Sequence, residues 1–174
     1  AAFEPKYHGE EPIGMPYARS WLESKLTVTT HEEPVEVTPG VHALGAIPRE
    51  YPDSRTGEHI VDGQRVADPV LDDQSLVVET DDGVSLVLGC CHAGLRNTIS
   101  YAESVFEEPV HTVVGGTHLR STDPEEIDPI VDWLDGRIER IAPTHCTGPV
   151  ARRALADAFG DNYVRVGAGS QLEL

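Results

Sequence analysis

Three histidines in the second half of the chain, His92, His118 and His145, each follow a run of apolar residues that ends in glycine or proline. Such a run predicts a buried strand that stops at a turn. If the three strands are parallel neighbours, their carboxyl ends lie at one edge of a sheet, which is where open α/β sheets bind ligands. Because neutral imidazoles are common ligands of zinc, iron and manganese, this spacing predicts one shared site.

Each histidine taken alone has a structural alternative, because a single histidine is often satisfied within a core and no H-x-H or H-x-x-x-H pair is present. The three cysteines, Cys90, Cys91 and Cys146, lie beside these histidines. An odd number with two adjacent members does not form a disulfide framework and indicates a reducing interior. The thiols are either close to a metal or buried and inert.

Residues that could contact an anion lie next to the histidines. Backbone N–H groups at Thr147 and Gly148, where the last long helix is predicted to begin, favour phosphate or carboxylate. Gly115 and Gly116 would let a substrate approach the backbone closely, and Arg96 could bind the same anion. The structural alternatives are a capping threonine, a plain turn and a solvated arginine. The motifs G-x-S-x-G and G-x-x-x-x-G-K are absent.

Strands and helices alternate in the second half of the sequence and would position these residues. An Asp-Gly turn at 82–83 predicts a hairpin of strands 75–79 and 84–88. Further strands are predicted at 110–115, 137–142, 163–166 and 171–174, and helices at 95–106, 121–135 and 149–159. Pro129 should kink the middle helix or delay its start. This order, β-β-α-β-α-β-α-β-β, predicts a layered α/β fold.

The first half of the sequence is less regular. A short helix is predicted near 16–23, with Pro16 at its start. Strands are predicted at 26–30, 33–37 and 41–44. Residues 47–71 have no steady period and contain three prolines, which predicts a long loop of the kind that often covers a site.

The composition restricts the environment and the partners. The 174 residues suffice for one domain with a real core. A net charge of −17 argues against binding nucleic acid or an anionic membrane surface. The basic residues are 11 arginines and 2 lysines, which favours adaptation to high salt, with an ordinary acidic protein as the alternative. No apolar run approaches the roughly 20 residues that span a bilayer, and no secretion signal is visible, so a cytoplasmic location is expected.

Several blocks of the sequence resemble the metallo-β-lactamase fold superfamily. They are Gly-Cys-Cys-His-Ala-Gly-Leu-Arg-Asn-Thr-Ile (89–99), Val-Gly-Gly-Thr-His-Leu (114–119) and Pro-Thr-His-Cys-Thr-Gly (143–148), with further similarity at 40–49 and 72–76. The branch they most resemble is the group named for dihydropterin–ribofuranosylaminobenzene phosphate synthase. The similarity runs from about residue 3 to residue 174.

The resemblance implies a four-layer αββα sandwich with one or two metal ions between its sheets. His92 and His145 match ligand positions of the family's motifs, and His118 is expected to act as a third ligand or a proton-transfer residue. The implied cofactor is a divalent metal, zinc first, with manganese, iron or magnesium as alternatives. The implied activity is that of a metal-dependent hydrolase or transferase acting on a small phosphorylated or pterin-like substrate.

One motif of the superfamily is absent from this sequence, namely H-x-H-x-D-H of the amino-terminal half. Residues 1–174 are therefore expected to be the carboxy-terminal part of one domain, with an incomplete sandwich. Three explanations are possible. We favour a truncated piece; the alternatives are one subunit whose partner chain supplies the motif, and a remnant without metal chemistry. A homo-oligomer is a further expectation. The competing hypothesis for function is a metal-free binding or assembly module that keeps the anion pocket.

Overall fold

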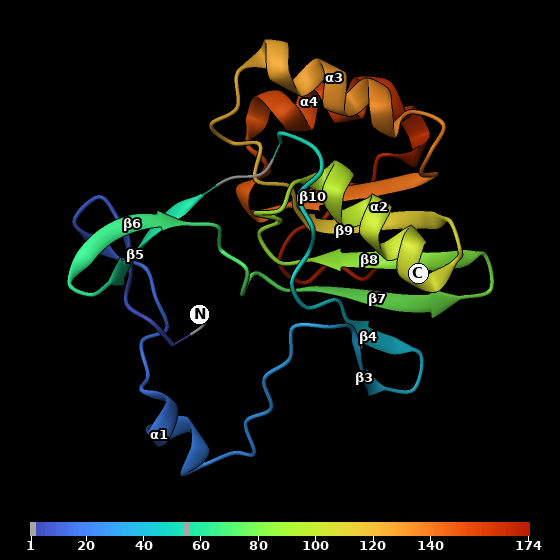
Figure 1. The fold of residues 1–174 in the computed structure, drawn as a ribbon. Helices are drawn as coiled ribbons and strands as arrows, with labels where there is room; N and C mark the ends of the chain where they lie inside the picture. The colour runs from blue at the N-terminus through green and yellow to red at the C-terminus, as the bar shows by residue number, and fades with distance from the viewer. Residues whose placement is uncertain (1–2, 54–55) are drawn as a thin grey trace.

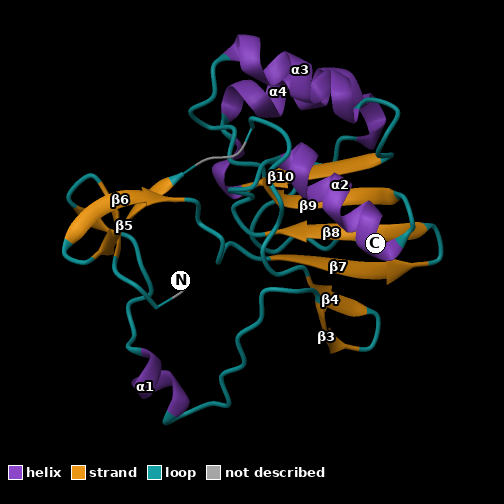
Figure 2. Cartoon of the chain, viewed as in Figure 1, coloured by secondary structure: helices purple, strands orange, loops and turns teal. Residues whose placement is uncertain are grey.

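Two sheets and four helices form the described part of the chain (Figure 1, Figure 2). The structure is a computed structural model and describes residues 3–53 and 56–174. The larger sheet has the strand order β10-β9-β8-β7-β4-β3, and the smaller sheet has the order β2-β1-β5-β6. The mixed α/β class predicted from the sequence is confirmed.

Within the described residues, every strand after β6 belongs to the larger sheet. Its strands are β3 (Val35–Thr38), β4 (Val41–Ala43), β7 (Ser75–Thr80), β8 (Gly83–Leu88), β9 (Val110–Gly116) and β10 (Arg140–Thr144). The smaller sheet consists of β1 (Lys6–His8), β2 (Glu11–Pro12), β5 (Gly57–Val61) and β6 (Gln64–Asp68). The helices are α1 (Arg19–Glu23), α2 (Leu95–Phe106), α3 (Pro124–Leu134) and α4 (Pro149–Phe159), with 3₁₀ turns η1 (His145–Thr147) and η2 (Gly160–Asn162).

The parallel part of the larger sheet positions the candidate site. Strands β7 and β8 form the predicted antiparallel hairpin, and β8, β9 and β10 then run parallel to one another. Helices α2 and α3 connect these parallel strands, as a parallel crossover requires. The carboxyl ends of β8, β9 and β10 therefore lie together, at the end of the sheet that faces β5 and β6 in Figure 1.

The core lies between the larger sheet and its helices. Helices α2, α3 and α4 each bury one apolar face: Leu95 and Ile99 on α2, Ile127 and Leu134 on α3, and Leu155 on α4 are at most 1% exposed. Their spacing of four and seven residues is the period of one helix face. Burying each such side chain stabilises the fold by roughly 1.5–3 kcal/mol.

Pro129 does not delay the start of α3, and the alternative, a kink at Pro129, stays a prediction. The helix begins at Pro124 and continues to Leu134 with Pro129 inside it, so the predicted delay of its start is wrong. Pro124 takes the first helical turn, where its missing N–H costs no hydrogen bond.

Three expectations for the first half need correction. Residues 26–30 form no strand, because no strand of the described chain pairs with them and Leu26 stays 63% exposed. The predicted long loop at 47–71 contains the hairpin β5–β6. Its two-residue turn is Asp62-Gly63, and Asp-Gly is a hairpin signal that the sequence prediction missed. The first helix begins at Arg19 rather than at Pro16. The predicted strands at 33–37 and 41–44 are confirmed as β3 and β4.

The predicted final strands are also wrong. Near Tyr163 the chain forms a single parallel bridge to Ile141, and the N–H of Val164 donates to the Ile141 carbonyl at 2.8 Å. No strand continues from there, and residues 171–174 have no regular structure. Tyr163 thus covers the free edge of β10 at one point without adding a strand.

Among the described residues, no helix combines the length and the apolar character that crossing a bilayer requires.

Candidate functional site

The ends of β8, β9 and β10 bring three sequence-distant turns together. Leu88 pairs with Gly115, and Gly116 pairs with Thr144, so the strands end in register. His92 and His118 follow the ends of β8 and β9 within a few residues, and His145 follows β10 directly. The convergence expected from the sequence is confirmed as a backbone arrangement.

Each of these turns contains a non-glycine residue with left-handed backbone. The φ angles are 62° at Cys91, 53° at His118 and 45° at His145. A residue with a Cβ rarely adopts this conformation, and such strain is concentrated at functional sites. The three occurrences at one sheet edge mark this edge as the candidate site.

The histidine and cysteine side chains form two overlapping groups, and Cys90 belongs to both. In the first, ligand atoms of Cys90, His92 and His118 lie within 4.8 Å of one another; in the second, those of Cys90, His145 and Cys146 do. The rings of His92 and His118 are 4.2 Å apart between centroids. His92 and His145, the two ligands implied by the family resemblance, thus belong to different groups.

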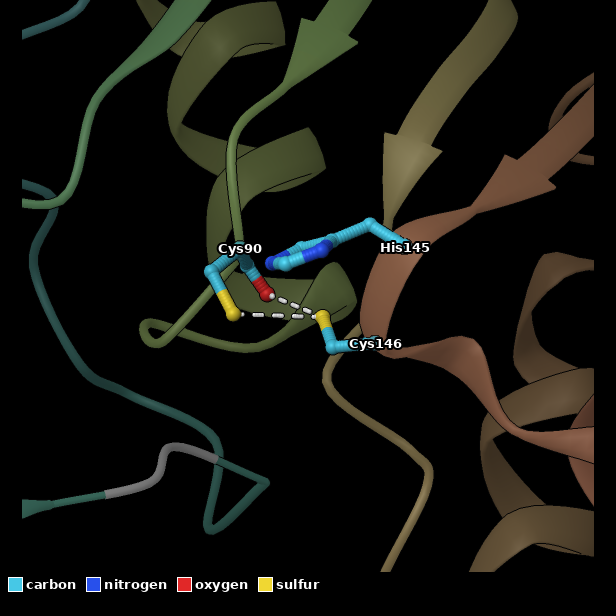
Figure 3. A group of neighbouring side chains, drawn as sticks. All are labelled: Cys90, His145 and Cys146. Carbon is cyan, nitrogen blue, oxygen red and sulfur yellow. Dashed lines mark hydrogen bonds between the residues drawn. The ribbon is translucent and has the colours of Figure 1, made fainter. Parts of the chain in front are cut away.

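Two thiols meet at the centre of the site. The Sγ atoms of Cys90 and Cys146 are 3.2 Å apart, and the sulfur of Cys146 lies 3.3 Å from the Cys90 carbonyl oxygen (Figure 3). The thiol of Cys90 donates to Cys146, which lowers the pKa of Cys146 and raises the pKa of Cys90. The backbone N–H of His118 donates to Cys146 at 3.1 Å and also favours its thiolate.

The third cysteine differs from the other two. Cys91 is 1% exposed, and its sulfur lies 3.5 Å from the hydroxyl of Thr98 on α2. Burial raises the pKa of its thiol to about 12. Of the two possibilities left open by the sequence, Cys91 therefore fits the buried, inert one.

One carboxylate that positions the site was missed by sequence reasoning. Asp73 precedes β7 and accepts hydrogen bonds from the backbone N–H of Cys90 at 3.3 Å and of His92 at 2.6 Å. These bonds fix the turn that presents both side chains. An acidic residue beside a strand start was the available signal, but the sequence does not indicate which turn it reaches.

The glycines at the end of β9 are in close contact with the protein itself. A Cβ on Gly115 would lie 2.3 Å from the Leu88 carbonyl oxygen. On Gly116 it would lie 2.5 Å from the Gly89 carbonyl oxygen and 2.9 Å from the sulfur of Cys146. The glycines therefore let β8 and the turn after β10 approach β9, while substrate contact at this point remains a prediction.

The predicted helix 149–159 is confirmed as α4, but the alternative role of Thr147 as its cap is not. Gly148 rather than Thr147 is the residue preceding the helix; its φ is 77°, and a Cβ on it would lie 2.6 Å from the Cα of Arg120. Thr147 is fully buried, and its hydroxyl donates to the Thr144 carbonyl at 2.7 Å. Thr147 thus closes the turn after β10, and an anion at this helix start remains a prediction.

Arg96 already has a partner in the protein. Its Nε lies 3.5 Å from a carboxylate oxygen of Asp53, whose side chain is 2% exposed. Its guanidinium also lies over the ring of Tyr51, 5.0 Å from the centroid. These contacts tie the loop before β5 to the start of α2, so binding of a substrate anion by Arg96 would have to compete with Asp53.

The donor atoms of the two groups are the kind that zinc prefers. Each group offers imidazole nitrogen and thiol sulfur and contains no carboxylate, whereas magnesium and calcium favour oxygen ligands. The residues present therefore fit a divalent metal of the zinc type. The cavity of about 710 Å³ between α3 and α4 is lined by none of these cysteines and histidines.

Two proteins of Methanocaldococcus jannaschii are similar in sequence to this chain. No family model matches the chain. The chain is 33% identical over 168 residues to the uncharacterized protein MJ0448 of Methanocaldococcus jannaschii, covering 95% of this chain and 63% of that protein. It is 28% identical over 145 residues to the 7,8-dihydropterin-6-methyl-4-(β-D-ribofuranosyl)-aminobenzene-5′-phosphate synthase of the same organism, covering 79% of this chain and 49% of the enzyme. The chain thus spans about half to two thirds of these relatives.

A solved structure resembles the whole fold. The crystal structure of Tm1679, described as a metal-dependent hydrolase of the β-lactamase superfamily, superposes with a TM-score of 0.87 and 30% sequence identity. The match covers 98% of this chain and 67% of that one. Together with the strand-end histidines, this similarity settles the family: the chain belongs to the metallo-β-lactamase superfamily.

Proposed function

We propose that this chain supplies metal-binding residues to a metal-dependent enzyme that acts on a small phosphorylated or pterin-like substrate. The observation that carries the proposal is the convergence of His92, His118 and His145 at one sheet edge, around Cys90. The relatives support it, because one is described as a metal-dependent hydrolase and another as a synthase of a dihydropterin phosphate. A hydrolase or a transferase is consistent with both.

The residues have distinct proposed roles. His92 and His145 bind the metal, for which zinc is the first choice and manganese, iron or magnesium are alternatives. When bound, such an ion polarises a phosphoryl oxygen and makes hydroxide available at neutral pH. His118, whose Nδ1 lies 3.0 Å from the Cys90 sulfur, is a third ligand or holds a proton for the reaction.

The substrate anion is proposed to bind at the same edge. Arg96, Gly115, Gly116, Thr147 and Gly148 are retained as its candidate contacts. The backbone at the start of α4 offers partial positive charge. Arg96 would serve only if the substrate draws it away from Asp53, which lies 3.5 Å away in this structure.

The complete site requires H-x-H-x-D-H from outside this sequence. We propose that an amino-terminal half of the same domain, or a second chain, carries it. Apolar side chains that such a segment could cover are exposed along residues 13–26: Ile13, Met15, Tyr17, Trp21 and Leu26 are 49–63% exposed, and α1 buries none of its residues. In Figure 1 this part lies apart from the larger sheet. Exposed apolar patches of this kind are typical of interaction surfaces.

The test uses the chain joined to, or co-expressed with, the segment that carries H-x-H-x-D-H. Replacing His92→Ala or His145→Ala should abolish stoichiometric metal uptake, measured by mass spectrometry. Either change should also lower hydrolysis of p-nitrophenyl phosphate or of a dihydropterin phosphate ester by ~100-fold or more.

His111→Ala is the matched control, because His111 lies on β9 and contacts Glu139 at 2.9 Å instead of the site. This variant should keep both metal and activity. Full activity of His145→Ala would overturn the enzyme proposal. A metal-free wild type that binds inorganic phosphate as well as His145→Ala does would favour the competing binding or assembly module.

A further inference from the structure

The two sulfurs at the centre of the site come from opposite sides of β9. Cys90 follows β8 and Cys146 follows β10, 56 residues apart in the sequence, yet their Sγ atoms are 3.2 Å apart. Both are partly buried, whereas the neighbouring Cys91 is fully buried and belongs to neither ligand group. The fold therefore brings two of the three thiols, those of Cys90 and Cys146, into contact.

An imidazole completes the arrangement. His145 extends its ring toward Cys90 in Figure 3, and its ligand nitrogen lies within 4.8 Å of both sulfurs. His145 and Cys146 are adjacent in sequence, and the left-handed backbone at His145, with φ of 45°, is what lets both face Cys90. Such a costly conformation is expected where the orientation of two side chains matters.

We propose that Cys90 and Cys146 are metal ligands and that, with His145, they form a thiolate-rich site for a thiophilic divalent cation, zinc in the cell. This thiolate-rich site would take its three protein ligands from this chain and none from H-x-H-x-D-H. The inference deepens the proposed function, on which it rests for the role of His145 as a ligand. A fourth position remains for water or a second imidazole.

The geometry needs only a small adjustment for this role. A tetrahedral zinc with Zn–S bonds of about 2.3 Å holds two sulfurs about 3.8 Å apart. The sulfurs, now 3.2 Å apart, would therefore have to separate by roughly half an ångström, which side-chain rotation can supply. Thiolates select zinc, cadmium and cobalt over magnesium and calcium, so the site should discriminate strongly among divalent ions.

The experiment titrates the reduced 174-residue chain with cobalt(II) as a spectroscopic substitute for zinc. Thiolate ligation produces a sulfur-to-cobalt charge-transfer absorption in the near ultraviolet, which should appear with one equivalent and disappear when zinc is added. Cys90→Ser and Cys146→Ser should each lose most of this absorption. Each should also weaken cobalt binding by more than the roughly 10–100-fold that loss of an outer-sphere partner costs.

Cys91→Ser is the matched control, since it makes the same sulfur-to-oxygen change at the residue next to Cys90. It should keep the charge-transfer absorption, because its sulfur faces Thr98. Circular dichroism of each variant confirms that it folds. The wild-type spectrum tests the inference even if a serine variant is unstable.

Three results would overturn the inference. The first is a wild type that binds cobalt without charge transfer; the metal then uses histidines alone, and the proposed function with His92 and His145 stands. The second is a Cys90–Cys146 disulfide in protein kept under reductant, seen as the loss of two hydrogens in the intact mass. The third is a Cys91→Ser variant that loses the absorption as fully as Cys90→Ser. Conversely, wild-type charge transfer without phosphoester hydrolysis by the completed enzyme would contradict only the proposed function.

Discussion

Individual residues at the sheet edge are constrained by close backbone contacts. Gly116 shows this most directly, because it lies under both His145 and Cys146. A Cβ there would be 2.9 Å from the sulfur and 3.0 Å from a ring carbon of His145. The glycine therefore supports the site by leaving space, a role that is not visible from its residue type alone.

Gly116→Ala should destabilise the chain and displace the turn after β10. Because its Cβ would also meet the Gly89 carbonyl oxygen, we expect a loss of about 1–3 kcal/mol in the free energy of unfolding. Cobalt binding should weaken in parallel. Urea denaturation and cobalt titration measure the two effects.

Gly167→Ala is the control for this substitution. Nothing lies within 4 Å of its Cβ position, and its backbone is not left-handed, so its effect should stay within about 0.5 kcal/mol. If Gly116→Ala were equally neutral, the close packing under His145 would not matter for stability.

At the scale of elements, one buried side chain ties the loop before β5 to α2. Asn97 accepts hydrogen bonds from the backbone N–H groups of Glu50 and Tyr51, both at 2.7 Å, and donates to the carbonyls of Tyr51 and Ala93. It is 3% exposed. The side-chain amide of Asn97 thus forms hydrogen bonds with four backbone groups and holds the loop before β5 against α2.

Asn97→Ala should lower the free energy of unfolding by about 3 kcal/mol, since hydrogen bonds worth about 1 kcal/mol each are lost and water regains only part of them. Denaturation in urea measures the loss. Asn162→Ala, at an exposed asparagine of η2, should change stability by no more than about 0.5 kcal/mol. Similar values for the two variants would contradict this role of Asn97.

The smaller sheet is held by a buried ion pair. Lys6 on β1 lies 2.7 Å from Asp68 on β6 and also contacts Asp72. Burial lowers the pKa of Lys6, but hydrogen bonds from its ammonium to both carboxylates raise it overall. Burial likewise raises the pKa of Asp68, yet the hydrogen bond from Lys6 brings it below the usual 3.8.

Lys6→Met should destabilise the chain by about 3–5 kcal/mol at neutral pH, because the charge of Asp68 is left buried without a partner. A carboxylate with a depressed pKa contributes stability above its usual pKa and loses it as the pH falls through the lower native value. The difference between wild type and variant should therefore shrink below about pH 4 in urea denaturation. Lys25→Met, at an exposed lysine, should show neither effect. A gap that persists into acid would contradict the pairing.

At the scale of the whole molecule, the dominant physical property is its charge. A net charge of −17 on 174 residues produces strong self-repulsion at low ionic strength. Salt shortens the screening length from about 10 Å at 0.1 M to about 3 Å at 1 M, so repulsion between surface carboxylates is then largely removed.

Raising potassium chloride from ~0.1 to ~1 M at pH 7 should therefore raise the melting temperature by several degrees, given that about 1 kcal/mol corresponds to about 2–4 °C for a domain of this size. Differential scanning calorimetry measures the shift. Near pH 4.6, where the net charge approaches zero, the same salt should have little effect. An equal shift at both pH values would show that salt acts through hydration instead of charge screening.

The sequence by itself determined the strand-end site. Alternation of apolar runs and helical periods fixes parallel strands joined by helices, and parallel strands must end at one edge. For that reason His92, His118 and His145 could be assigned to one place, and the glycine pair and the turn before α4 could be assigned to the same edge. The buried faces of the helices and the β7–β8 hairpin follow from the same local periodicity.

Only the tertiary structure decided how the site is assembled. Two contacts join residues far apart in sequence. The sulfurs of Cys90 and Cys146 are 3.2 Å apart, and the carboxylate of Asp73 accepts a hydrogen bond from the backbone N–H of His92. Such contacts depend on the exact path of three turns, which no local period encodes. The same reason explains the missed hairpin β5–β6 and the strands wrongly expected at 26–30, 163–166 and 171–174, because a strand exists only where another strand pairs with it.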